Sequence, residues 1–428
     1  MVKGLEIEKR EREDGISVLV AILFIVGEIA GTGVLAFPES MKGIGWSGPL
    51  VIVIGCVGGG YAGVLLGKSW LLLEDQDTSL RNIKTRNPYS LIGFVAAGVT
   101  GRAVTTITLI AMLFGSAVVQ MLIFAEMVQS LIPENHFVSA SFCKWIILVG
   151  IILLPFSLLG SPVDFWPVAF FAMSSTTIAC ILIVTAIFLE DTENTIATAE
   201  PPDRSITIKS VLLGFSTIIF GYGGASALPT IQNDMKDKRR FTTAVVIAFS
   251  LMMCLYLPVS VISYWKFGDH VKSNIVRNLT PSPLVTLIEC LVLAHVFCAF
   301  LIQLNPVNLT TESILGLDHS FNWKRCLSRS CVIGLAIFTG QAVPKFGKLL
   351  NLLGSFTVTM QSYILPAIFY YLLCPPSKAT VVVKTVLIVM MVVGVLVAIS
   401  SSFFSLIELF HPNAFTQPCF ICDCVKLD

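Results

Sequence analysis

Glu28 is a carboxylate in the middle of a long apolar run, and its neighbours are unusually rich in glycine. Residues 27–33 read GEIAGTG. An ionisable group at bilayer mid-depth costs about 3 kcal/mol or more, so its default interpretation is functional. Glycine allows the backbone to leave the helix and to present bare N–H and C=O groups. We expect Glu28 to bind and release a proton there. A purely structural Glu28, hydrogen-bonded to loosened backbone, stays open as the alternative.

A second glycine cluster lies about 190 residues further on, where residues 220–229 read FGYGGASALP, again near the middle of an apolar run. Unwound backbone inside a membrane is tolerated only where protein or a polar cavity satisfies it. The N–H groups that begin a half-helix suit a carboxylate, and the carbonyls that end one suit an ammonium group or a cation. A zwitterionic amino acid needs both. The bland alternative for both clusters is close helix packing.

Close packing is our interpretation of Gly55, Gly59, Gly63 and Gly67, which recur every four residues. The formal G-x-G-x-x-G at 58–63 lies inside an apolar span with no strand before it, so we expect no dinucleotide site.

Two further ionisable residues, Glu289 and His295, lie in another apolar run. Six positions separate them, which is about 240° around a helix, so they do not share a face. Both are candidates for proton or ion coupling, and His295 is equally well explained as a packing residue.

The composition of the chain is that of a polytopic membrane protein, so membrane helices must position these residues. Of 428 residues, 55% are hydrophobic and 13% charged, against about 25% charged in soluble domains. This excludes a water-soluble globule and a disordered chain, and the net charge of +1 offers no basic excess for nucleic acid. No H-E-x-x-H, G-x-S-x-G or filter-like loop is present, so neither an enzyme nor a channel is expected.

Because about 20 apolar residues cross a bilayer, we expect an all-α bundle of eleven membrane helices. They are placed at Ile16–Phe37, Gly48–Leu73, Val104–Ile132, Lys144–Leu159, Phe165–Leu189, Val211–Thr230, Phe241–Tyr264, Pro283–Gln303, Cys331–Val343, Leu349–Cys374 and Val381–Phe404. The first and sixth contain the glycine clusters. Breaks five spans apart are what a 5+5 inverted repeat would produce, with one extra C-terminal helix.

Nearly two thirds of the Lys and Arg residues fall on one side if the N-terminus is cytoplasmic, which predicts a cytoplasmic N-terminus and an extracytoplasmic C-terminus. The expected parts are a cytoplasmic tail at 1–15, a transmembrane domain at 16–410 and an extracytoplasmic tail at 411–428.

That second tail holds Cys419, Cys422 and Cys424. Three thiolates make a poor zinc site, and we expect no metal. A disulfide is favoured, with Cys143 as one candidate partner, although the sequence does not assign the pairing. Asn278 begins an N-x-T triplet in an expected outside loop and is a candidate glycosylation site, weakened by Pro281.

The glycine clusters also carry a resemblance. GTGVLAFP at 31–38 followed by Gly45-Trp46, and FGYGG at 220–224 with PTIQNDMK at 229–236, resemble the amino acid/auxin permease family. Asn305-Pro306 with Glu312 resembles the same family less specifically. This family belongs to the APC superfamily, which shares the leucine-transporter fold. The similarity covers nearly the whole chain.

The resemblance implies secondary active transport of amino acids by alternating access. It implies a substrate site made of Ala30, Gly31, Thr32, Gly33, Phe220, Gly221, Tyr222, Gly223 and Gly224. Backbone at 31–33 would take the substrate carboxylate and carbonyls near 220–223 its amino group, with Phe220 and Tyr222 lining the side-chain pocket. Many members carry Asn where this chain has Gly27, so a proton is favoured over sodium as the coupling ion.

An amino acid sensor with the same pocket and a sodium-coupled symporter stay open as alternatives. The substrate's identity does not follow from the sequence. We expect no cofactor, a monomer in the lipid bilayer, and residence in the plasma membrane or in a vesicular or lysosomal membrane.

Overall fold

The computed structural model describes residues 15–78, 80, 87–132, 141–158, 166–190, 207–317, 322–375, 380–410 and 419. Every regular element among these residues is helical, and the β-structure is one isolated bridge between Ile16 and Met235. Both expected tails, 1–15 and 411–428, lie outside the described residues except for Gly15 and Cys419.

The α-helices in chain order are α1 Val18–Ile29, α2 Gly33–Lys42, α3 Gly48–Gln76, α4 Pro88–Leu131, α5 Phe142–Leu158, α6 Trp166–Leu189, α8 Ile208–Gly221, α9 Leu228–Asp234, α10 Phe241–Phe267, α11 Pro283–Ile314, α12 Trp323–Ala342, α13 Phe346–Leu353, α14 Leu365–Leu373 and α15 Val381–Phe410. Two π-helical segments, Gly354–Val358 and Met360–Ile364, join α13 to α14.

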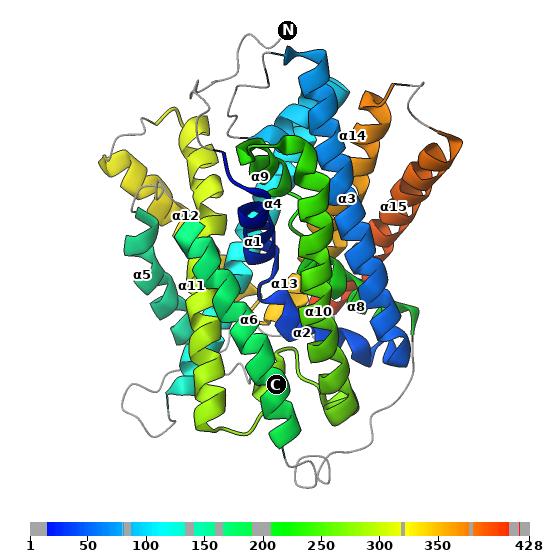
Figure 1. The fold of residues 1–428 in the computed structure, drawn as a ribbon. Helices are drawn as coiled ribbons and strands as arrows, with labels where there is room; N and C mark the ends of the chain where they lie inside the picture. The colour runs from blue at the N-terminus through cyan, green and yellow to red at the C-terminus, as the bar shows by residue number, and fades with distance from the viewer. Residues whose placement is uncertain are drawn as a thin grey trace.

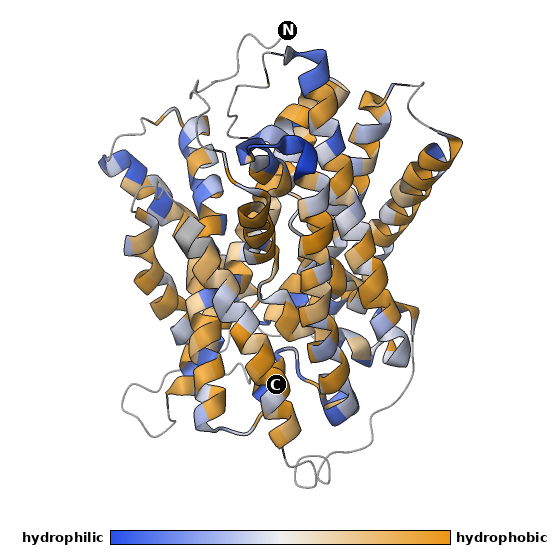
Figure 2. Ribbon diagram, viewed as in Figure 1, coloured by the Kyte–Doolittle hydropathy of each residue, from blue (hydrophilic) through white to orange (hydrophobic). Residues whose placement is uncertain are grey.

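Apolar composition and helix length make this a membrane protein. In the described part of the chain, seven helices are long and apolar enough to cross a bilayer, and α1 with α2 forms an eighth candidate that is bent by 57°. The helices α5 and α8 are apolar but shorter. Hydrophobic residues cover the middle of the bundle, and polar residues gather toward the helix ends (Figure 2). The expectation of an all-α polytopic membrane protein is confirmed at this level.

Two helices begin earlier than the sequence predicts. We expected α4 from Val104, but it begins at Pro88 and changes direction at Ala97 and Gly98, where φ of Gly98 is +65°. We expected α12 from Cys331, but it begins at Trp323. The earlier turns were not predicted because charged residues interrupt the apolar pattern. Arg102 interrupts it in α4, and Arg325 interrupts it in α12.

The broken helices occupy the centre of the bundle (Figure 1). α1 packs against α6 and α10, and α2 packs against α8 and α10. Most of their apolar side chains are buried, with Ala21, Ile25 and Phe37 at 0% exposure, although Leu19 at the start of α1 is 65% exposed. By contrast α15 is mostly exposed along its apolar length and lies at the periphery. The bundle therefore surrounds the two segments that contain the glycine clusters.

Candidate functional site

The first break separates α1 from α2 at Ala30, Gly31 and Thr32. Ala30 leaves the helical conformation with ψ of 82°, and the Ile29 carbonyl accepts a hydrogen bond from Tyr256 Oη at 3.1 Å. The N–H groups of Thr32 and Gly33 donate to no acceptor among the described residues. Both residues line a cavity. Unpaired N–H groups at the start of a ten-residue helix form a site for an anion.

The second break follows α8, which ends at Gly221. Tyr222 has left the helix with ψ of 6°, and the segment 223–227 is irregular before α9 begins at Leu228. The Phe220 carbonyl accepts the Gly223 N–H at 2.9 Å. The carbonyl end of α8 thus faces the same cavity that the N–H end of α2 faces, since Phe220, Gly221 and Gly223 also line it.

The two breaks pack directly against each other, which explains why glycine is needed. A Cβ atom on Gly33 would lie 2.6 Å from the Cα of Gly221, and one on Gly221 would collide with the Phe37 ring. A Cβ on Gly31 would lie 3.0 Å from His295 Nε2. Close packing and a ligand site are therefore both served by the same glycines.

A small polar cavity lies between the breaks, with a volume of about 30 Å³. Besides the two breaks, its walls come from α4, α11 and the first π-helical segment. These added residues are Met112, Ser116, Gln120, His295, Ala299, Gln303 and Val358. A water molecule needs about 10–15 Å³ on this measure, so the cavity in this state holds only a few waters. A bound amino acid requires the surrounding helices to separate.

Three neutral side chains present unpartnered polar atoms at this cavity. The atoms are Gln120 Oε1, His295 Nε2 and Gln303 Oε1, and each is buried without a hydrogen-bond partner. Buried polar atoms are nearly always satisfied, so three at one cavity indicate a place for a polar ligand or water. Gln120 and Gln303 were not predicted as site residues, because neither side chain is ionisable. A glutamine inside an apolar run was the available signal.

His295 is held in place by α6. Its Nδ1 lies 2.8 Å from Thr176 Oγ1 and 3.2 Å from the Ala172 carbonyl. Thr176 Oγ1 itself donates to the same carbonyl at 3.0 Å, so Nδ1 carries the proton that is shared between these two oxygens. In the neutral ring Nε2 is then a hydrogen-bond acceptor. His295 therefore presents a lone pair toward Gly31.

Glu28 lies in the last turn of α1, is half-buried and lines the cavity. No described residue forms an ion pair or hydrogen bond with its carboxylate. The structure thus brings Glu28 and His295 to one cavity. Glu289 is elsewhere, because it lies close to Ser130 and Arg277 near the start of α11 and does not line the cavity. Glu289 and His295 therefore lie at different places in the bundle, as their spacing predicts.

Three residues expected at the pocket, Ala30, Tyr222 and Gly224, do not line it. Tyr222 is buried in an aromatic cluster, with its ring centroid 5.5 Å from that of Phe37 and 5.4 Å from that of Tyr256. The same ring also stacks on Phe249, with the ring centroids 6.3 Å apart. Gly224 packs against Ile29, where a Cβ atom would collide. Neither lines the cavity, and neither does Ala30, whereas Phe220 does.

Asn278, the candidate glycosylation site, lies in a turn and is mostly buried. Its side chain is 9% exposed, Nδ2 donates to the His270 carbonyl at 2.9 Å, and Oδ1 accepts from the Lys272 N–H at 2.8 Å. These two hydrogen bonds close a turn, and glycosylation of Asn278 stays a prediction.

A disulfide joins Cys143 at the start of α5 to Cys419. The Cys419 N–H donates to the Gln341 carbonyl at 2.9 Å, and Gln341 Nε2 donates to the Cys143 carbonyl at 2.9 Å. Cys422 and Cys424 lie outside the described residues.

Comparison with known proteins gives one consistent result. The family described as "Transmembrane amino acid transporter protein" matches residues 14–407. "Amino acid transporter AVT1J" of Arabidopsis thaliana is 22% identical over 394 residues, which cover 90% of this chain and 89% of that protein. "Amino acid transporter AVT1C" of the same plant is 23% identical over 353 residues, 81% of this chain but 62% of the relative. "Lysine histidine transporter-like 1" is 29% identical over 174 residues, 38% of each chain.

Proposed function

The chain belongs to the transmembrane amino acid transporter family, and on that premise we propose that it is a secondary active transporter that carries amino acids across a membrane by alternating access. The observation that carries the proposal is the pair of facing breaks around one polar cavity. Unpaired N–H groups of Thr32 and Gly33 suit the substrate carboxylate, and carbonyls at the end of α8 suit its ammonium group.

The proposed arrangement is a leucine-transporter-like 5+5 repeat. In this assignment the broken spans α1/α2 and α8/α9 are the first helix of each repeat, and α15 is the additional helix. The central place of the broken spans and the peripheral place of α15 support it.

Alternating access in this scheme needs the cavity to open and close. At about 30 Å³ the cavity belongs to a closed state. Helices α1, α2, α8 and α9 then move relative to α4 and α11, because the cavity walls are divided between these two groups. Gly31 of the first group faces His295 of α11, and the lack of a side chain there leaves this contact between the two groups free to change.

A proton is the proposed coupling ion, with Glu28 as the group that carries it. Glu28 is the one acidic residue on the cavity wall, and it has no basic partner in the described residues. When Glu28 is protonated it is neutral, and a neutral group inside the membrane avoids the cost of a buried charge while the binding site changes sides. Release of the proton on the opposite side of the membrane then returns Glu28 to its charged form for the next transport cycle.

The proposed orientation places the N-terminus in the cytoplasm. The Lys and Arg distribution supports it. The Cys143–Cys419 bond supports it too, since disulfides persist in oxidising compartments and this bond lies at the end expected outside.

Reconstituted liposomes test the function. A panel of radiolabelled amino acids is offered with a proton gradient, with a sodium gradient, and with neither. The proposal predicts accumulation of at least one amino acid above equilibrium with the proton gradient only. Accumulation with the sodium gradient alone would identify sodium, and not the proton, as the coupling ion. Binding of amino acids without any flux, in vesicles that exclude leaks, would favour a sensor and contradict the proposal.

A further inference from the structure

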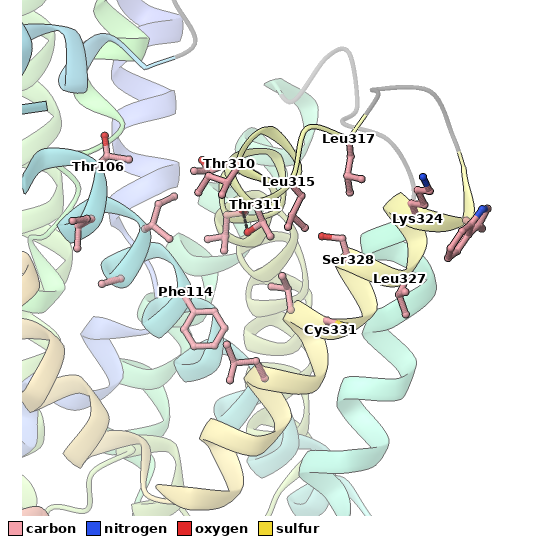
Figure 3. A pocket seen from close by; sticks show the side chains of 18 residues that line it. Thr106, Phe114, Thr310, Thr311, Leu315, Leu317, Lys324, Leu327, Ser328 and Cys331 are labelled. Carbon is pink, nitrogen blue, oxygen red and sulfur yellow. Dashed lines mark hydrogen bonds between the residues drawn. The ribbon is translucent and has the colours of Figure 1, made fainter. Parts of the chain in front are cut away.

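A second cavity, much larger than the transport cavity, lies away from the transport site. It is an open groove of about 910 Å³ on the outer surface of the bundle, between α4, α11 and α12 (Figure 3). Its walls are apolar side chains such as Ile110, Phe114 and Leu335. Several of its residues face the surroundings, with Ile314 at 79% exposure and Leu327 at 56%. In a bilayer these surroundings are lipid.

The groove has the length of a lipid chain and a direction. Its lining on α12 runs from Trp323 to Leu335, which is about 18 Å along a helix. One end carries Lys324 and Ser328, and the other end is apolar, as Figure 3 shows for Lys324 and Phe114. Lys324 Nζ lies 5.9 Å from the Trp323 ring centroid. Tryptophan and lysine side by side are typical of the headgroup level of a membrane.

The charge at the polar end favours an anion. Lys324 is exposed at the groove, whereas the neighbouring Arg325 and Arg329 are buried and both form ion pairs with Glu312. The positive charge at this end is therefore that of Lys324. In the proposed orientation this end faces the cytoplasm, and the cytoplasmic leaflet is where anionic phospholipids concentrate. An apolar slot with a basic mouth complements an acyl chain with an anionic headgroup.

We propose that this groove binds an anionic phospholipid of the cytoplasmic leaflet, with an acyl chain between α4, α11 and α12 and its headgroup at Lys324. The inference goes beyond the transport function. It also connects to it, because the groove packs on α4 and α11, whose other faces carry Gln120 and His295 at the transport cavity. A lipid in the groove contacts the outer side of helices that line the substrate path.

Lipid binding to the full chain is measured by native mass spectrometry after release from detergent. The probes are phosphatidylserine, phosphatidylcholine and cholesterol. We expect phosphatidylserine to bind with one lipid per protein, about fivefold more tightly than phosphatidylcholine, as one basic side chain near an anionic headgroup typically gives. Lys324→Ala should remove that preference. Lys384→Ala is the matched control, because Lys384 lies at the same expected side at the start of α15, outside the groove. It should keep the preference.

Equal binding of the two phospholipids, equal losses in the two lysine variants, or a preference for cholesterol would each overturn the proposal.

A second pair of variants tests the place. Ala111 lines the groove and is exposed, so Ala111→Trp fills the slot without entering the core. Val392→Trp on the exposed side of α15 is its control. We expect about the same loss of bound phosphatidylserine for Ala111→Trp as for Lys324→Ala, and none for Val392→Trp. Cys331→Trp, at another exposed groove position, replaces Ala111→Trp if that protein aggregates. Unchanged lipid binding in the groove-filled protein would contradict the proposal. So would a dimer of the wild type that Ala111→Trp dissociates.

Discussion

At the scale of single residues, Glu28 differs from every other group at the transport cavity because it alone can carry a negative charge there. The surrounding polar atoms of Gln120, Gln303 and His295 are acceptors in the described structure. A protonated Glu28 can donate a hydrogen bond to one of these acceptors, whereas a charged Glu28 would compete with the substrate carboxylate for the N–H groups of Thr32 and Gly33. Protonation and ligand binding are therefore expected to affect each other at this cavity.

Replacing Glu28 separates transport coupling from substrate binding. Glu28→Gln keeps the shape and a donor group but cannot release a proton. We expect accumulation driven by a pH gradient to fall to the equilibrium level, while exchange of labelled for unlabelled substrate continues. Glu289→Gln is the control, since Glu289 does not line the cavity, and it should keep accumulation. Normal accumulation in Glu28→Gln would remove Glu28 from the coupling mechanism.

Gly31 is the residue where added volume should do most damage to the site. A Cβ atom there reaches 3.0 Å from His295 Nε2, and overpacking costs about 1–3 kcal/mol. Gly31→Ala should weaken substrate affinity by roughly 5- to 150-fold, and the branched Gly31→Val should eliminate uptake. Gly334→Val is the matched control, because Gly334 lies on α12 with open space around it. Uptake is measured alongside surface labelling, and near-normal uptake in Gly31→Val would count against the site.

At the scale of elements, the start of α1 is tied to the end of α9. The Ile16 N–H donates to the Asp234 carbonyl at 2.8 Å, and the Lys236 N–H donates to the Ile16 carbonyl at 3.0 Å. Next to this pairing, buried Lys238 forms an ion pair with Glu74 of α3 and donates to Asn233 Oδ1 at 2.8 Å. These contacts join both broken spans to α3 at the end expected to face the cytoplasm. We interpret them as what keeps that end closed.

Breaking this ion pair should open the cytoplasmic end. Removing one partner of a buried ion pair typically destabilises a structure by about 3–5 kcal/mol, because the other charge is left buried and unpaired. In a conformation that is open to the cytoplasm, Glu74 would be hydrated, so the loss of Lys238 should favour that conformation. Lys238→Met combined with Ser116→Cys at the cavity should react with a thiol reagent several-fold faster from the cytoplasmic side than Ser116→Cys alone. Lys236→Met is the control, because that side chain is exposed. Equal reaction rates in the two cavity-cysteine proteins would show that the ion pair does not hold the end closed.

At the scale of the whole molecule, the sequence predicts helical segments and breaks well, because both depend on local composition. Glycine at 31 and 221 marks the breaks, and apolar runs mark the spans. The residues of the cavity wall could not be predicted in this way, because Gln120 and Gln303 come from two helices that are far apart in the chain. Nor does composition reveal that Tyr222 points into an aromatic cluster, since that depends on Phe37 and neighbouring helices.

The orientation of the whole bundle is tested by the disulfide. If the end carrying Cys143 faces an oxidising compartment, a non-reducing digest should contain the Cys143 and Cys419 peptides joined, and reduction should separate them. Cys419→Ser should leave Cys143 free and reactive toward a membrane-impermeant maleimide from outside. Rapid labelling of both cysteines in the unreduced wild type would contradict the bond, and labelling only from the cytoplasmic side would invert the orientation.

The central claim is that an amino acid binds between the two broken helices through their bare backbone groups. The most direct measurement is a cryo-EM map of the protein with a transported amino acid identified in the liposome assay. The account predicts ligand density with its carboxylate at the Thr32 and Gly33 N–H groups and its ammonium group at the α8 carbonyls near Phe220. Substrate density at another place, or two continuous helices through residues 29–33 and 220–228, would contradict it.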